Sequence, residues 1–117
     1  MKKLLLTLAL TFFTLQIYAN PVCGAGASDR AKAREDLKKE LLADYEDSYT
    51  TVKMLLKAGM KDYDKICKIR STLINNEILG GLKSDYYPSF TTIYMLFKDN
   101  KEAYTELEYD KPCSFRC

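Results

Sequence analysis

Histidine and tryptophan are both absent from this chain of 117 residues. The lack of histidine excludes Ser-His-Asp and Cys-His catalysis, and also zinc ligation by imidazole. Gly24-Ala25-Gly26 has neither a preceding strand nor a lysine where a phosphate-binding loop needs one. The acidic residues are best explained as solvated helix faces and caps. We therefore predict a protein that is not an enzyme and that binds no cofactor or metal.

Long runs of charge of one sign are also missing. The whole chain has 18 basic and 16 acidic residues, and Lys2 and Lys3 alone account for the excess. Nucleic-acid binding requires a basic surface that displaces counterions. Because both lysines belong to a predicted signal peptide, the remaining chain would have no net charge. We expect no nucleic-acid partner.

The N-terminal apolar run, from Leu4 to Leu15, is shorter than the about 20 residues that cross a bilayer. Lys2 and Lys3 precede it and Ala19 follows, which is typical of a cleaved secretory signal. An uncleaved anchor is the alternative. We predict a signal peptide at 1–19 and one exported domain at 20–117, periplasmic or secreted, without stable membrane insertion.

Four cysteines follow the predicted cleavage site: Cys23, Cys67, Cys113 and Cys117. An even number in a short exported chain indicates two disulfides, for which three pairings are possible. A Cys113–Cys117 bridge would close only a very small ring. We therefore predict that both tail cysteines reach back, one to Cys67 and one to Cys23. The C-x-x-x-C spacing differs from the C-x-x-C of thiol oxidoreductases.

The apolar pattern is helical from Arg30 to about Lys57. Residues spaced by three and four share one face, namely Leu37, Leu41, Tyr45, Tyr49, Val52 and Leu56. One helix of this length would be long for so small a domain. A break near Asp47-Ser48 is expected because both residue types prefer caps to helix interiors. Gly59 is predicted to end the segment.

A second helix is predicted to begin at Asp62 or Asp64 and to end at Gly80-Gly81. After a connection at 82–87, a third helix is expected at 88–98, although a strand there is the competing interpretation because 91–94 is rich in β-formers. Asp99-Asn100 would cap a short last helix at 101–108. The predicted fold class is an all-α, disulfide-stapled bundle of four or five helices.

Tyrosine is abundant, with nine residues in the chain. Those that share inner helix faces are predicted to be core residues: Tyr45, Tyr49, Tyr63, Tyr94 and Tyr104. Tyr86 and Tyr87 are adjacent in an expected loop and could anchor a partner, or cap the core locally. The first candidate partner-binding surface is Asp85, Tyr86, Tyr87 and Phe90. The second is Phe115 and Arg116, between the tail cysteines.

These observations favour an exported protein-binding module, such as an inhibitor or immunity protein that neutralises a toxin or hydrolase. In size, predicted class and predicted compartment, the chain resembles small helical, disulfide-bonded periplasmic immunity proteins that guard against cell-wall amidases. That resemblance rests on overall build, because no sequence motif carries it. The alternatives are a secreted toxin or effector that acts on other cells, and a carrier of small apolar ligands.

Overall fold

The computed structural model describes residues 20–24 and 27–109. The predicted signal peptide and the C-terminal residues, including Cys113, Phe115, Arg116 and Cys117, lie outside this part of the chain. The described residues contain four helices: α2 (Ala27–Asp44), α3 (Tyr49–Cys67), α4 (Leu73–Tyr86) and α5 (Phe90–Tyr109). The all-α prediction is confirmed. The alternative of a strand at 91–94 is wrong, because these residues lie within α5.

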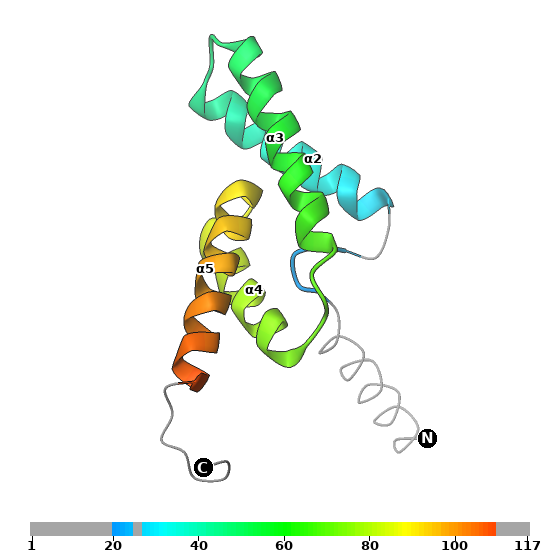
Figure 1. Cartoon of the computed structure of the whole chain (residues 1–117). Helices are drawn as coiled ribbons and strands as arrows, with labels where there is room; N and C mark the ends of the chain where they lie inside the picture. The colour runs from blue at the N-terminus through cyan, green and yellow to red at the C-terminus, as the bar shows by residue number, and fades with distance from the viewer. Residues whose placement is uncertain (1–19, 25–26, 110–117) are drawn as a thin grey trace, which may run out of the picture.

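The helices form two antiparallel hairpins, α2–α3 and α4–α5 (Figure 1). Helix α3 packs against α2 on one side and against α5 on another, and α5 also packs against α4. The N-terminal end of α3 and the C-terminal end of α2 project beyond the second hairpin as a free tip (Figure 1). Helix α3 therefore joins the two halves of the domain.

The predicted break near Asp47-Ser48 is confirmed, since α2 ends at Asp44 and α3 begins at Tyr49. The Ser48 amide donates to the Tyr45 carbonyl in the turn, at 3.1 Å. The Ser48 and Thr51 hydroxyls form a hydrogen bond of 2.6 Å. Asp47 and Ser48 thus lie in a turn, where short polar side chains can bond locally without competing with a helix.

The prediction that Gly59 and Gly80-Gly81 end helices is wrong. Gly59 is buried inside α3, and Gly80 and Gly81 lie inside α4. A Cβ atom at Gly59 would lie 2.5 Å from Cδ2 of Leu37 on α2. Gly59 therefore permits close approach of the two helices, a tertiary role that local pattern does not reveal.

The predicted helix from Asp62 or Asp64 to Gly81 does not exist as one unit. Helix α3 continues to Cys67, and α4 begins only at Leu73. Thr72 caps α4, because its hydroxyl accepts a hydrogen bond of 3.1 Å from the Asn75 amide. The Asn75 side chain adds a bond of 2.9 Å to the Arg70 carbonyl, which holds the α3–α4 connection against the new helix.

Two glycine substitutions are expected to have opposite effects on stability. Gly59→Ala should lower the free energy of unfolding by about 1 kcal/mol, because overpacking against Leu37 outweighs the gain in helix propensity. Gly81→Ala should raise it by about 0.5–1 kcal/mol, because a Cβ there meets no atom within 4 Å. Urea unfolding measures both. If the contact with Leu37 is the cause, Gly59→Ala should become stabilising in a Leu37→Ala background.

The predicted division of the last helix is also wrong. Helix α5 is continuous through Asp99 and Asn100, both of which are exposed. The Asn100 side chain donates to the Leu96 carbonyl at 2.8 Å, a bond made within the helix. Solvated polar side chains of this kind are tolerated in a helix interior even though they prefer caps.

The largest fully buried side chains come from the part of the domain where α3, α4 and α5 meet: Tyr63, Phe90, Ile66, Leu79 and Ile93. The Tyr63 and Phe90 rings pack edge to face, with centroids 5.0 Å apart. Tyr63 is therefore a core residue, as predicted, and Tyr94 and Tyr104 are partly buried. Tyr45 and Tyr49 are exposed, Tyr49 by 73%, because they lie at the hairpin tip with no helix beyond it.

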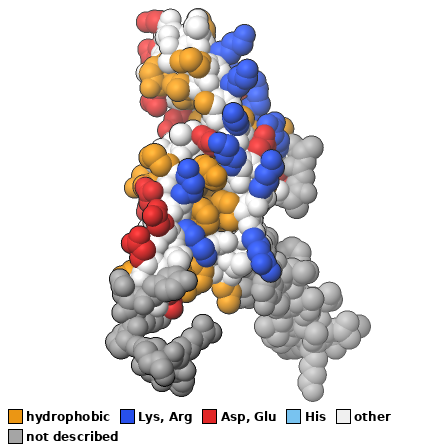
Figure 2. All heavy atoms as spheres, in the orientation of Figure 1, with side chains coloured by type: hydrophobic (Ala, Val, Ile, Leu, Met, Phe, Trp, Pro, Cys, Tyr) orange, Lys and Arg blue, Asp and Glu red, His pale blue; other side chains and the backbone are white. Residues whose placement is uncertain are grey.

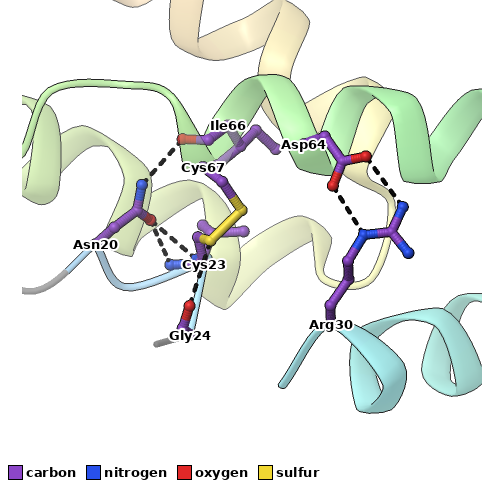
Figure 3. The surroundings of a disulfide bond; sticks show 8 residues. Asn20, Cys23, Gly24, Arg30, Asp64, Ile66 and Cys67 are labelled. Atoms are coloured by element: carbon purple, nitrogen blue, oxygen red, sulfur yellow. Dashed lines mark hydrogen bonds and ion pairs between the residues drawn. A yellow bond between two sulfur atoms is a disulfide. The ribbon is translucent and has the colours of Figure 1, made fainter. Parts of the chain in front are cut away.

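The disulfide in the described residues joins Cys23 to Cys67, which corrects the predicted pairing of each with a tail cysteine. Asn20 positions the bridge (Figure 3): its side-chain amide donates to the Ile66 carbonyl at 3.0 Å, and its carbonyl oxygen accepts from the Val22 and Cys23 amides. This turn lays the segment before α2 along the end of α3. Cys23 and Cys67 thereby become neighbours although they are distant in sequence.

Candidate functional site

A groove with a volume of about 690 Å³ runs along the α2–α3 hairpin. We call it the basic groove. Its apolar lining comes from Met54, Leu56, Ala58 and Met60, and its charged rim from Arg30, Arg34, Lys53, Lys57, Lys61 and Asp64. Met54 is 63% exposed, so its side chain is open to a ligand in the groove. The groove therefore combines an accessible apolar floor with five basic groups and one acid.

The lysines of the groove form a row along α3. Lys53, Lys57 and Lys61 recur every four residues, and Lys65 continues the series. Four residues advance an α-helix by about 6 Å, so the row follows one side of the helix. Figure 2 shows basic side chains arranged beside α3. The sequence signal for this row is the i, i+4 spacing of the lysines. It was not among the predicted sites, because the lysines are separated by other residues and do not form a continuous run of charge.

Most of the positive charge in the groove is uncompensated. Asp64 pairs with Arg30 through two hydrogen bonds, of 2.9 and 3.0 Å, which also hold α2 against α3 (Figure 3). Within the described residues, Lys53, Lys57 and Lys61 take part in no ion pair. Their ammonium groups are therefore available for an anionic partner.

The hydrogen bonds from Arg30 hold the pKa of the Asp64 carboxyl below its ordinary value. A carboxyl with a lowered pKa stabilises the folded state above its unfolded pKa, and this contribution is lost as the pH falls through the folded value. Asp64→Asn should therefore cost about 0.2–1 kcal/mol at pH 7, since the pair is half exposed. Urea unfolding over a range of pH measures the free energy of unfolding of both proteins. If it falls equally with pH in wild type and variant, the Arg30–Asp64 pair does not stabilise the fold. We expect their difference to shrink as the pH falls through the lowered pKa of Asp64 and its carboxyl becomes protonated.

Tyr87, a predicted partner-binding residue, is used inside the fold. Its hydroxyl donates to the Asp36 carboxylate on α2 at 2.6 Å, and Lys32 contacts the same oxygen at 3.0 Å. These bonds lower the pKa of Asp36, whereas burial and the nearby carboxylate raise the pKa of Tyr87. The Tyr87 ring also packs edge to face on Phe90. Tyr87 therefore links α2 to the α4–α5 turn as a local cap over the core.

The other residues of the first predicted surface differ in their exposure to solvent. Asp85 and Tyr86 are exposed at the end of α4. Phe90 is 0% exposed and cannot contribute to an exposed contact surface, which corrects that part of the prediction. The physical reason is that the helix stripe containing Phe90 faces α3 and α4. Partner binding by Asp85 and Tyr86 stays a prediction, and Phe115 and Arg116 lie outside the described residues.

Asp62 and Asp64 engage separate partners. Asp62 accepts a hydrogen bond of 2.7 Å from Thr91 on α5, whereas Asp64 pairs with Arg30 on α2. In residues 20–24 and 27–109, no group of three or more cysteine, aspartate or glutamate side chains is arranged to hold a metal ion. No helix in the same ranges is both long and apolar enough to span a membrane.

Comparisons with protein-family models, with curated proteins and with solved structures find no match to this chain.

Proposed function

We propose that this chain is a non-enzymatic protein-binding domain whose basic groove binds an acidic helical segment of another protein. The observation that supports this most strongly is the row of unpaired lysines beside the exposed Met54 on α3. Amphipathic helices bind in grooves through apolar anchors, and charge selects among them. Methionine suits such a floor because its flexible thioether side chain adapts to different partners.

The regular spacing of Lys53, Lys57 and Lys61 favours a helix as the ligand. A helix that lies along α3 and has acidic residues at i, i+4 and i+8 repeats at the same rise of about 6 Å. Each of its carboxylates can then meet one lysine. The groove lining contains no aromatic side chain on which a nucleic-acid base could stack, which favours a protein ligand over single-stranded nucleic acid.

We further propose that the domain is exported and acts by holding its partner, as an inhibitor or immunity protein does. The Cys23–Cys67 disulfide supports an oxidising compartment. The bridge and the Arg30–Asp64 pair both fix α3, the helix that carries the lysine row. A groove with fixed walls loses less conformational entropy on binding, which suits tight, non-catalytic capture.

The test is a titration with two synthetic peptides of identical composition. One has glutamates at i, i+4 and i+8 beside leucines on one helix face, and the other has the same residues out of register. We expect the in-register peptide to bind the oxidised protein at least about tenfold more tightly at low salt, because only it pairs each carboxylate with a lysine.

Charge-reversed protein provides the matched control. The K53E/K57E/K61E variant should lose binding of the in-register peptide by at least about tenfold. Lys39→Glu, an exposed change on the opposite side of α2 from the buried Leu37 and Leu41, should leave it within about twofold. Equal binding of both peptides, or equal losses in both variants, would contradict specific recognition by the groove.

A further inference from the structure

Helix α5 presents an acidic face toward solvent. Met95, Asp99, Glu102 and Glu106 recur at spacings of four, three and four, so they share one side of the helix. All four are exposed, Met95 by 53%. We call this set the acidic ridge. The opposite side of α5 carries Phe90, Ile93 and Phe97, which are buried.

The acidic ridge is uncompensated in the same way as the basic groove. Among the described residues, Asp99, Glu102 and Glu106 make no ion pair. Figure 2 shows acidic side chains gathered over α5, at the edge of the molecule away from the basic row beside α3. Two surfaces of opposite charge thus lie on different sides of one small domain.

We propose that the basic groove of one molecule binds the acidic ridge of a second copy. This inference rests on the proposed function, because it takes the groove to be a protein-binding site. The ridge shares three features with the inferred ligand: it is helical, its three acids share one face, and an exposed methionine precedes them. Its acids are spaced by three and four residues rather than by four and four. From Asp99 to Glu106 the helix advances by about 10 Å, and from Lys53 to Lys61 by about 12 Å. The two spans differ by about 1.5 Å, the rise of one residue, and a long, flexible lysine side chain can cover that difference. Each of the three acids can therefore meet one of the three lysines.

The contact must form between molecules. Within one chain the buried side of α5 packs against α3 and α4, so the ridge faces away from its own groove. Such a contact joins two different surfaces. If each of two molecules places its ridge in the groove of the other, the contact forms a closed dimer. If only one groove of each pair is filled, further molecules can add and the assembly is open-ended.

A charge-swap experiment tests the proposal on the oxidised protein. The groove variant K53E/K57E/K61E and the ridge variant D99K/E102K/E106K are each studied alone and as an equimolar mixture, by sedimentation velocity over a range of concentrations. Wild type should self-associate at low salt, and each variant alone should be monomeric, because its two surfaces now repel. The mixture should associate again, since each altered surface meets one of opposite charge.

The dissociation constant of wild type should rise at least about tenfold between low salt and 0.5 M salt. Monomeric wild type at all concentrations, or a mixture that stays monomeric while both variants keep wild-type helicity, would overturn the proposal. If wild type is monomeric yet binds the in-register acidic peptide, only the second copy as ligand is wrong. If it neither self-associates nor binds the peptide, the proposed function fails as well.

Discussion

Phe90→Ala is expected to lower the free energy of unfolding by about 3–5 kcal/mol, the usual cost of truncating a buried phenylalanine. Phe90 is fully buried, and its ring contacts both Tyr63 and Tyr87 edge to face. The substitution would therefore leave a cavity where α3, α4 and α5 meet, and it would remove two aromatic contacts. Urea unfolding followed by circular dichroism measures the loss.

The matched control is Tyr86→Ala, four residues earlier and exposed at the end of α4. It should change stability by no more than about 0.5 kcal/mol, the range of most surface substitutions. Phe90→Leu, which keeps most of the volume, should fall between the two. If Phe90→Ala and Tyr86→Ala had similar small effects, Phe90 would not be the centre of the core.

Replacing both Cys23 and Cys67 by serine is expected to lower the free energy of unfolding by about 4 kcal/mol on the chain-entropy account of disulfides. The bridge closes a loop with a sequence separation of 44 residues and fixes the segment before α2 to the end of α3. Without it, the Asn20 turn and buried Val22 lose their covalent attachment. Urea unfolding of the oxidised wild type and the variant measures the difference.

The C113S/C117S variant separates this pairing from the one expected from sequence. If Cys23 and Cys67 bond to each other, the variant retains their bridge, and a non-reducing peptide map should contain a fragment joining Cys23 to Cys67. Its loss of stability should be less than half that of C23S/C67S. The same map of oxidised wild type is the decisive one, and a fragment there that joined Cys23 or Cys67 to Cys113 or Cys117 would refute the bridge seen in the structure.

Apolar periodicity predicted the helices better than it predicted their ends. The stripe of Leu37, Leu41, Val52 and Leu56 is buried as expected, because a helix in a small domain must cover its apolar face. Gly59, Gly80 and Gly81 were poor guides to helix ends. A glycine that ends a helix and one that allows two helices to touch look the same in a sequence. Only the position of Leu37 across from Gly59 distinguishes them.

The candidate site was only partly accessible from sequence. The search for exposed aromatic anchors selected Tyr87 and Phe90, which the fold uses to cover and fill its core. The basic groove was missed because α3 supplies the lysine row while α2 supplies Arg30 and Arg34. The near-zero net charge of the chain also did not indicate a basic surface. Net charge is a sum over the chain, whereas a binding surface depends on where the charges lie.

The sequence by itself determined the helical class, the break between Asp44 and Tyr49, and the spacing of lysines and acids along individual helices. These are local properties, set by periodicity and by the preferences of short polar residues. Only the tertiary structure decided which cysteine joins Cys67, which tyrosines are buried, and that α2 and α3 together form a basic groove away from the acidic face of α5. These features depend on contacts between segments distant in the chain, and local patterns carry no record of which faces will meet.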